Sequence, residues 1–375
     1  MRRGVFKAFE NFTLLLPSLA FAMFSAASGS ARVSHVGAAP NLPSLQEGQN
    51  PAAVESELKT PADPQVKAVL DKMAAAGIAH PITVAEVRKA YLFYPRLSGT
   101  PEHVFRVEDR QIPGPAGNIL VRVYTPSSTS GLPVLVFFHG GAFVAGSLDT
   151  HDTPLRSVAN RCQCIVVSVA YRLAPENKYP AAPEDAYAAT KWVAEHGADI
   201  GGDPHRIAVG GDGAGGNLAA AVTLMAREQG GPHLIFQVLI YPMLDATIMK
   251  PSWWTDTPIV SRESKNEMLG MYLPPTGNLR DPLVSPIFAE NLKNLPPALV
   301  VIDEDDPMRD EGEEYAGRLK QDAVLVKVSR YPTMIHGFFL MAGDLDAGKK
   351  CIDETANALS SAFKGASQGA PPTFH

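Results

Sequence analysis

A short run of small residues constrains this chain more than any other segment. It reads Gly211-Asp212-Gly213-Ala214-Gly215, and its two flanks differ in pattern. Before it, Arg206–Gly210 has the apolar character of a buried strand, and after it Ala214–Glu228 reads as a helix. Glycine tolerates backbone conformations that other residues avoid, which suits a sharp turn between these elements. The segment predicts a strand that passes directly into a helix, the repeating unit of a parallel sheet covered by helices.

Position 213 is the unusual point of this turn. In the pattern G-x-S-x-G, the central serine is a nucleophile that the turn lifts above the sheet. Gly213 takes that place here, while the outer glycines, Gly211 and Gly215, are present. An ordinary strand–helix turn is the simpler interpretation, because a single Gly-x-Gly match is weak. Other segments of the chain decide between these two interpretations.

A second glycine motif follows another predicted strand. His139-Gly140-Gly141-Ala142-Phe143 comes directly after the apolar run Val134–Phe138, which is typical of a buried parallel strand. Without a Cβ in the way, backbone N–H groups in such a loop can approach a ligand oxygen closely. With the N–H group after the nucleophile, they would form an oxyanion hole; the alternative is a tight loop without function. The candidate donors are Gly140, Gly141, Ala142 and Ala214.

An acid and a histidine follow the turn in a telling order. Asp306 comes after the predicted strand Ala298–Ile302, and His336 lies in the segment Ile335–Phe338. Turn, acid and histidine in this chain order is the arrangement of α/β-hydrolases, and it differs from the orders of the two common serine-protease folds. A lone aspartate or histidine more often lies on the surface or caps a helix, but three elements in this order after strands indicate a catalytic set.

Together these motifs resemble the hormone-sensitive-lipase-like family of bacterial esterases, within the α/β-hydrolase fold. The resemblance covers roughly residues 100 to 345 and rests on HGGAF (139–143), YRLAPE (171–176), GDGAGGN (211–217), YP (241–242), SP (285–286), LPPALV (295–300), DPMRDEG (306–312) and HGF (336–338). It implies a carboxylic ester hydrolase of the Ser-His-Asp type that needs no cofactor and no metal. It further implies Asp306 as the acid and His336 as the general base, with a small-molecule ester of short to medium acyl length as substrate.

Three residues depart from the family pattern. Gly213 replaces the serine and removes the nucleophile, whereas Ala142, in place of a third glycine, still supplies the backbone N–H group that the site needs. Ala170 stands where an aspartate is usual, which puts in doubt a local polar contact but not the chemistry.

Gly213 predicts a very poor hydrolase with an intact fold. Glycine has no side-chain atom to attack an ester or to carry an acyl group. The nucleophile of such a turn usually has a strained, positive φ, which glycine adopts without steric cost. An introduced change that disables an esterase, a natural relative that binds a small ester or acid without turnover, and an error in the sequence each account for the glycine.

The N-terminus has the layout of a secretory signal peptide. Positive charge at Arg2, Arg3 and Lys7 precedes the apolar run Leu14–Phe24 and then small residues up to Ala31. We expect a signal peptide over residues 1–31 and a linker over 32–63, and hence a periplasmic or secreted protein. The alternative is an N-terminal helix that packs on the rest of a cytoplasmic protein.

Composition limits the possible partners. A net charge of −6 over 375 residues gives no electrostatic reason to expect nucleic acid or an anionic membrane as a partner. No segment beyond the N-terminus is long and apolar enough to span a bilayer, and the oligomeric state is left open. Cys162 and Cys164 fall in a predicted strand, Cys162–Val169, where neighbours two apart are poorly placed to bond to each other. We therefore expect buried free thiols.

Alternating strand-like and helix-like segments over residues 104–363 predict a mostly parallel, doubly wound sheet with helices on both faces. We expect N-terminal cap helices over 64–100, the hydrolase core over 101–365 with a cap insertion at 245–280, and a flexible tail over 366–375. Phe143, Trp253 and Trp254 are candidates for the substrate pocket. An aromatic cluster such as the tryptophan pair is more often part of a core than of a pocket.

Overall fold

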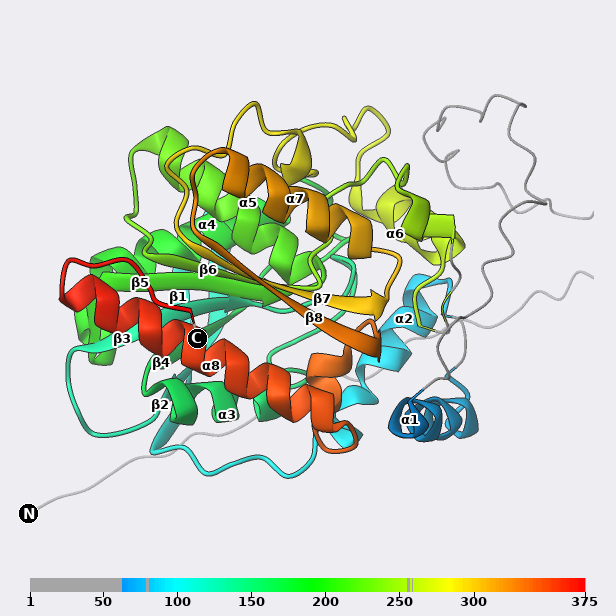
Figure 1. Ribbon diagram of the computed structural model, residues 1–375, viewed down its shortest axis with the longest axis horizontal. Coiled ribbons are helices and arrows are strands. Elements are labelled where there is room, and N and C mark those ends of the chain that lie inside the picture. Colours follow the sequence, from blue (N-terminus) through cyan, green and yellow to red (C-terminus); the bar gives the residue numbers. More distant parts are fainter. Residues whose placement is uncertain (1–62, 79–80, 255–256, 258, 375) are drawn as a thin grey trace, which may run out of the picture. The chain divides into compact units, whose positions relative to one another are not determined.

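The computed structural model describes residues 63–374 apart from 79–80, 255–256 and 258, all within the compact unit Ala39–His375. The predicted signal peptide, and the linker up to residue 62, lie outside the described residues. Figure 1 shows a central sheet of eight strands in the order β1-β2-β4-β3-β5-β6-β7-β8. The strands are β1 (Arg106–Gly114), β2 (Gly117–Thr125), β3 (Leu132–Phe138), β4 (Ile165–Ala170), β5 (Gly202–Asp212), β6 (Phe236–Ile240), β7 (Ala298–Asp305) and β8 (Val326–Ile335).

The sheet is parallel except at one edge. β2 runs antiparallel to both β1 and β4, and every other neighbouring pair is parallel. All residues of β3 and of β6 are buried. Such continuous apolar strands are expected where helices cover both faces of a sheet. The predicted mostly parallel sheet is therefore confirmed.

Helices cover both faces of the sheet. α3 (Asp152–Cys162) and α8 (Asp346–Ser367) pack against each other on one face, while α4 (Ala181–His196), α5 (Ala214–Gln229) and α7 (Arg309–Gln321) lie on the other (Figure 1). The buried apolar side chains accordingly form two clusters, one on each side of the strands. The sheet is held from both sides, which fixes the ends of its strands in space.

Three further helices belong to the segments that we expected to cap the core. α1 (Pro64–Ala75) begins at Asp63, whose side chain accepts a hydrogen bond from the Gln65 N–H. α2 (Val84–Tyr91) and α6 (Arg262–Tyr272) each begin with a capping box, from Thr83 and from Ser261. Figure 1 shows α2 and α6 at the end of the sheet toward which β7 and β8 point.

The expectation of two free thiols is wrong. Cys162 is the last residue of α3, and β4 begins only at Ile165, three residues later than we predicted for this strand. Between the two cysteines, Gln163 has a left-handed backbone conformation with φ 51°. This turn brings their Cα atoms to 5.3 Å, and Cys162 and Cys164 form a disulfide.

The segment predicted as a flexible tail, residues 366–375, begins within α8. α8 extends to Ser367, and the chain then folds back on it, so that the Ser361 hydroxyl donates a hydrogen bond to the Thr373 carbonyl at 2.7 Å. The ring of Phe374 lies 6.1 Å from that of Phe236. Beyond α8, Pro372 is buried and Phe374 is half-buried, whereas residues 368–371 are exposed.

Across the described ranges, no helix combines the length and the apolar character that a bilayer span requires.

Candidate active site

Four of the residues singled out in the sequence directly follow parallel strands. His139 comes after β3, Gly213 after β5, Asp306 after β7 and His336 after β8. Parallel strands end at the same edge of a sheet, and ligands of such sheets bind beyond that edge. The topology therefore gathers residues that are nearly 200 positions apart in the sequence.

The turn at Gly213 has the strained geometry expected of a nucleophile's position. Gly213 has φ 53° and ψ −115° and stands immediately before the first turn of α5. Its N–H donates to the Ile240 carbonyl at 3.0 Å, which ties the turn to the neighbouring strand β6. The outer glycine Gly215 is required for packing, because a Cβ there would lie 1.8 Å from the Phe138 carbonyl oxygen. The turn is thus fixed by contacts on both sides.

His336 lies beside the position that a side chain at residue 213 would occupy. Its Nδ1 lies 2.8 Å from Oδ2 of Asp306, and the Oδ1 atom of Asp306 accepts a hydrogen bond from the Met308 N–H at 2.8 Å. A Cβ built on Gly213 would lie 3.3 Å from Nε2 of His336. The structure therefore places His336 between Asp306 and the position of a side chain at residue 213, which is the arrangement of an acid, a base and a nucleophile.

The glycine loop after β3 borders the same site. Gly141, Ala142 and Phe143 all have positive φ, of 129°, 51° and 63°. In the described part of the chain, the N–H groups of Gly141 and Ala142 have no protein acceptor, and Ala214 is the first residue of α5. All of these residues line the pocket. Three N–H groups are thus available to a ligand oxygen.

Gly140 must be removed from the predicted oxyanion donors. Its N–H donates to Oδ1 of Asp212 at 2.8 Å, so it is not free to bind a ligand. The same oxygen lies 2.9 Å from Nε2 of the buried His151. Burial alone would raise the pKa of Asp212, but the nearby His151 and the Gly140 N–H bring it below its ordinary value. A buried carboxylate thus joins the glycine loop to the turn, a role that we did not foresee for Asp212 or His151.

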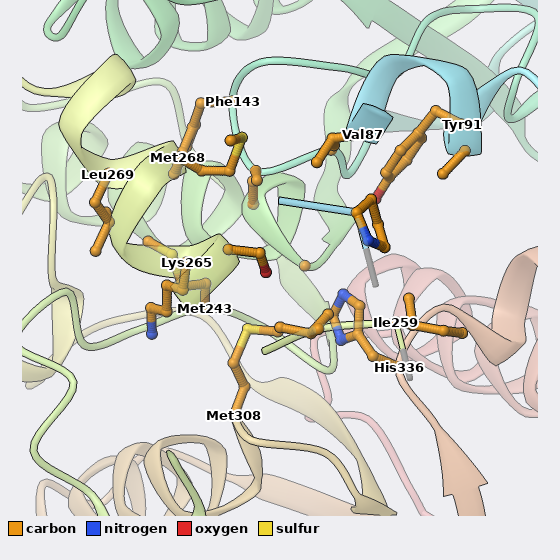
Figure 2. Close-up of a pocket in the computed structure, with 18 of the residues that line it drawn as sticks. Val87, Tyr91, Phe143, Met243, Ile259, Lys265, Met268, Leu269, Met308 and His336 are labelled. Carbon is orange, nitrogen blue, oxygen red and sulfur yellow. The ribbon is translucent and has the colours of Figure 1, made fainter. Parts of the chain in front are cut away.

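A pocket opens above these groups. Its cavity volume is about 90 Å³. Figure 2 shows Val87 and Tyr91 of α2 facing Met268 and Leu269 of α6 across the pocket, with His336 and Met308 below them. Apart from His336 and Lys265, the lining is largely apolar. The two helices in the expected cap segments therefore supply opposite walls.

The two tryptophans divide into one that lines the pocket and one that does not. Trp253 is buried in the pocket wall, and its Nε1–H donates to Oε2 of Glu311 at 3.1 Å. Trp254 is 52% exposed, and its ring lies under the guanidinium of Arg262. Trp254 is therefore outside the pocket lining, contrary to our prediction, whereas Phe143 lies in the lining.

Lys265 is a pocket residue that the sequence did not reveal. Its ammonium donates to the Asp245 carbonyl at 2.9 Å and lies 3.5 Å from Oε2 of Glu311. Burial raises the pKa of Glu311 to about 7, against the pull of Lys265, and burial lowers the pKa of Lys265. This buried pair fastens α6 to α7. The one signal in the sequence that could have revealed Lys265 is its place on the inward face of the amphipathic helix α6.

Within the described ranges, one group of residue types that bind metal ions lies together, namely Asp303, Asp306 and His336. One such atom of each lies within 4.8 Å of the others. Nδ1 of His336 already contacts Asp306, so a metal would have to displace that contact. The arrangement fits the orientation of a histidine better than a metal centre.

Fold and site together have the features of a hydrolase framework: a strand–turn–helix, a glycine loop with free N–H groups and an Asp–His pair at the carboxyl edge of a parallel sheet. The profile of a family with the alpha/beta hydrolase fold matches residues 135–340. The chain belongs to this hormone-sensitive-lipase-like family of α/β-hydrolases and is a hydrolase by family.

Curated relatives in this family bear esterase names. The chain is 40% identical over 312 residues to carboxylesterase NlhH of Mycobacterium tuberculosis, covering 80% of this chain and 96% of the relative. It is 42% identical over 282 residues to esterase LipI of the same organism, covering 74% and 88%.

Solved structures agree with the fold. A hyperthermophilic esterase from Pyrobaculum calidifontis matches with a TM-score of 0.76 at 41% identity, covering 80% of this chain and 99% of the other. A mutant of the alpha/beta hydrolase LAE6, from the metagenome of Lake Arreo in Spain, matches with a TM-score of 0.77 at 34% identity, covering 81% and 99%.

Proposed function

We propose that this chain has the framework of a carboxylic ester hydrolase for small-molecule esters of short to medium acyl length, and that Gly213 leaves it nearly inactive. The observation that carries the proposal is the position of His336, whose Nε2 lies 3.3 Å from where a Cβ at residue 213 would be. A serine there would place its hydroxyl beside the one nitrogen able to accept its proton. The esterase names of the relatives support the same substrate class.

The mechanism follows from this geometry once a hydroxyl is present. Nε2 of His336 accepts the hydroxyl proton while the oxygen attacks the ester carbonyl, and Asp306 holds the ring and stabilises its positive charge. The N–H groups of Gly141, Ala142 and Ala214 would bind the developing oxyanion. His336 then donates the proton to the leaving alcohol, and water releases the acid from the acyl-enzyme.

In the chain as it stands, no atom can form the acyl-enzyme. A water molecule activated by His336 would have to attack the ester directly, without the side-chain tether that positions a serine. Loss of the nucleophile in a serine hydrolase costs about 10⁶ in turnover, with roughly 10³ over the uncatalysed rate left to the rest of the site. We therefore expect a residual rate only.

A second candidate function is ligand binding without turnover. The pocket keeps its apolar walls, and His336 and the three residues that carry the free N–H groups all line it. This arrangement suits a small ester or a carboxylic acid, whose oxygen the N–H groups would bind. The two candidate functions predict different effects of a serine at position 213: the hydrolase should gain activity, and the binding protein should not.

We also keep the proposal that the protein is exported to the periplasm or beyond. It rests on the signal-peptide pattern of residues 1–31. N-terminal sequencing of the protein from the periplasm of its host would test it, and a full-length chain found only in the cytoplasm would contradict it.

The test of function is hydrolysis of p-nitrophenyl esters of graded chain length by the parent chain, Gly213→Ser and Gly213→Ala. We expect kcat/KM of the serine variant to exceed that of the parent by at least about 10⁴-fold. The alanine variant is the matched control, since it adds the same Cβ at positive φ without a hydroxyl, and it should stay near the parent rate. Equal rates in all three, with tight binding of a carboxylic acid, would favour the binding function.

A further inference from the structure

Asp303 is a buried acid that takes no part in the proposed hydrolysis. It lies near the end of β7, three residues before Asp306, and only 1% of it is exposed. Among the described residues, no donor group is in hydrogen-bonding geometry with either carboxyl oxygen, but the side chain is close enough to Asp306 for a hydrogen bond once one of the two carries a proton. An ionised carboxylate buried in this way is costly, because the protein supplies nothing to replace its water shell.

The groups around Asp303 make its negative charge still less favourable. One of its carboxyl oxygens lies within 4.8 Å of Asp306 and His336. Burial raises the pKa of Asp303 well above its ordinary value, and the charges of Asp306 and, more weakly, Asp305 act in the same direction. Tyr241, after β6, and Cys351, on α8, also lie close enough for the charge of Asp303 to raise their pKa values.

A neutral Asp303 would be a hydrogen-bond donor beside a carboxylate that can accept one. Asp306 already has the Met308 N–H at Oδ1 and His336 at Oδ2. A carboxylate has about four acceptor positions, so a third donor can be accommodated. Two close carboxyl groups in a dry environment commonly share one proton. In this pair, the proton would stay on Asp303 while Asp306 keeps its charge for His336.

We propose that Asp303 is a positioning residue, whose neutral carboxyl group donates a hydrogen bond to Asp306 and so fixes the carboxylate that orients His336. The inference rests on the proposed function, because its role is to hold the acid of the hydrolytic site. Asp303 itself touches no substrate and transfers no proton to the reaction. It acts by limiting the rotation of Asp306 and by sharing its negative charge.

The role predicts a pH dependence. When Asp303 loses its proton at alkaline pH, two carboxylates face each other behind His336, and the donor becomes a second acceptor. The neutral neighbours, Tyr241 and Cys351, do not offset this charge, and Asp305 adds to it. Activity restored by a serine should therefore decline on the alkaline side, and this decline should be absent when Asp303 is replaced by a residue that cannot ionise.

The test compares Asp303→Asn, which keeps a donor at nearly the same place, with Asp303→Ala and Asp303→Val, which have none. The first measurement is the downfield proton NMR resonance of the His336 Nδ1–H, recorded on the chain with Gly213 in place. It needs no turnover, so it tests the positioning role even if the serine variant proves inactive. We expect the resonance to be retained in the Asn variant and to broaden or shift in both variants without a donor.

The second measurement is the pH profile of kcat/KM for the same substitutions combined with Gly213→Ser. We expect the Asn variant to stay within about threefold of the restored enzyme, and the Ala and Val variants to lose about 10- to 100-fold in kcat with KM nearly unchanged. Loss of the alkaline decline in the Asn variant would support the role further. Identical NMR spectra and rates in the Asn, Ala and Val variants would overturn it.

Discussion

The floor and the walls of the pocket are formed by different groups, the floor by backbone and the walls by side chains. The floor consists of backbone turns held by glycines and by short contacts, such as the bond from the Gly140 N–H to Asp212. The walls consist of side chains on α2 and α6, which reach the pocket from separate segments of the chain. We propose that the chemistry depends on the floor and that selection of the substrate depends on the walls. A change in one can leave the other intact, and a glycine in place of a serine at position 213 would alter the floor alone.

The largest expected effect is on kcat, and it comes from removing the base in the floor while the walls stay unchanged. In the Gly213→Ser background, His336→Ala should lower kcat by about 10⁴-fold or more, because the serine loses the base that accepts its proton. KM should change little, since the apolar walls bind the substrate. Steady-state kinetics with a p-nitrophenyl ester measure both values. A large rise in KM with kcat preserved would show that His336 belongs to the walls and not to the chemistry.

The second prediction concerns how firmly the floor is held. Asp212→Ala should lower the free energy of unfolding by about 3 kcal/mol, because it leaves the buried His151 and the Gly140 N–H without their shared acceptor. Urea denaturation measures the change. Asp71→Ala is the control, since Asp71 forms an exposed ion pair with Lys67 and should matter by less than about 0.5 kcal/mol. Similar losses in both variants would mean that Asp212 does not support the floor.

The third prediction concerns the pH dependence of stability that arises from Glu311, whose contact with Lys265 holds α6, one wall of the pocket, against α7. Its pKa is raised from 4.5 to about 7, so the folded chain holds this proton in a pH range where the unfolded chain has released it. The free energy of unfolding should then fall as pH rises through this window, by roughly 2 kcal/mol. Glu311→Gln should remove that part of the pH dependence.

Denaturation at pH 5 and pH 8 measures the pH dependence of both chains. Glu314→Gln provides a control on the same helix, because the side chain of Glu314 is 48% exposed and pairs with Lys250. It should keep the slope of the parent chain. A Glu311→Gln variant with an unchanged slope would contradict the assignment.

The smallest expected effect sharpens the role of the walls. Met268, on α6, is buried in the pocket lining, so Met268→Ala in the Gly213→Ser background should make room for longer acyl chains. We expect the preference for longer over shorter p-nitrophenyl esters to rise about fivefold. Trp254→Ala is the control, because its ring is exposed and outside the lining, and it should leave the preference unchanged. Equal shifts in both variants would place the selecting wall elsewhere.

The floor was predictable from the sequence because each of its parts is local. The strand, turn and helix around Gly213 leave a recognisable pattern, and so does the loop after β3. The order of Asp306 and His336, each after a strand, then placed them at one edge of the sheet. The one error there was Gly140, whose N–H is taken by an aspartate 72 positions away.

The walls and the support behind the floor were less predictable, because they depend on contacts between distant segments. Trp253 and Trp254 are adjacent in one short 3-10 helix (Pro251–Trp254), and only its docking decides which ring turns inward. The pair of Lys265 and Glu311 joins two helices, and His151 meets Asp212 across the sheet edge. The disulfide at Cys162 escaped prediction because a helix end and a strand start were merged into one strand.

We propose that the floor is complete except for the hydroxymethyl side chain that a serine would carry at residue 213. The most direct test is to treat the parent chain, Gly213→Ser and Gly213→Ala with a p-nitrophenyl alkylphosphonate and to measure intact mass and p-nitrophenol release. We expect one phosphonyl group per molecule of the serine variant, attached at position 213, and none on the other two chains. A serine variant that stays unlabelled, or that is labelled at another residue, would contradict it.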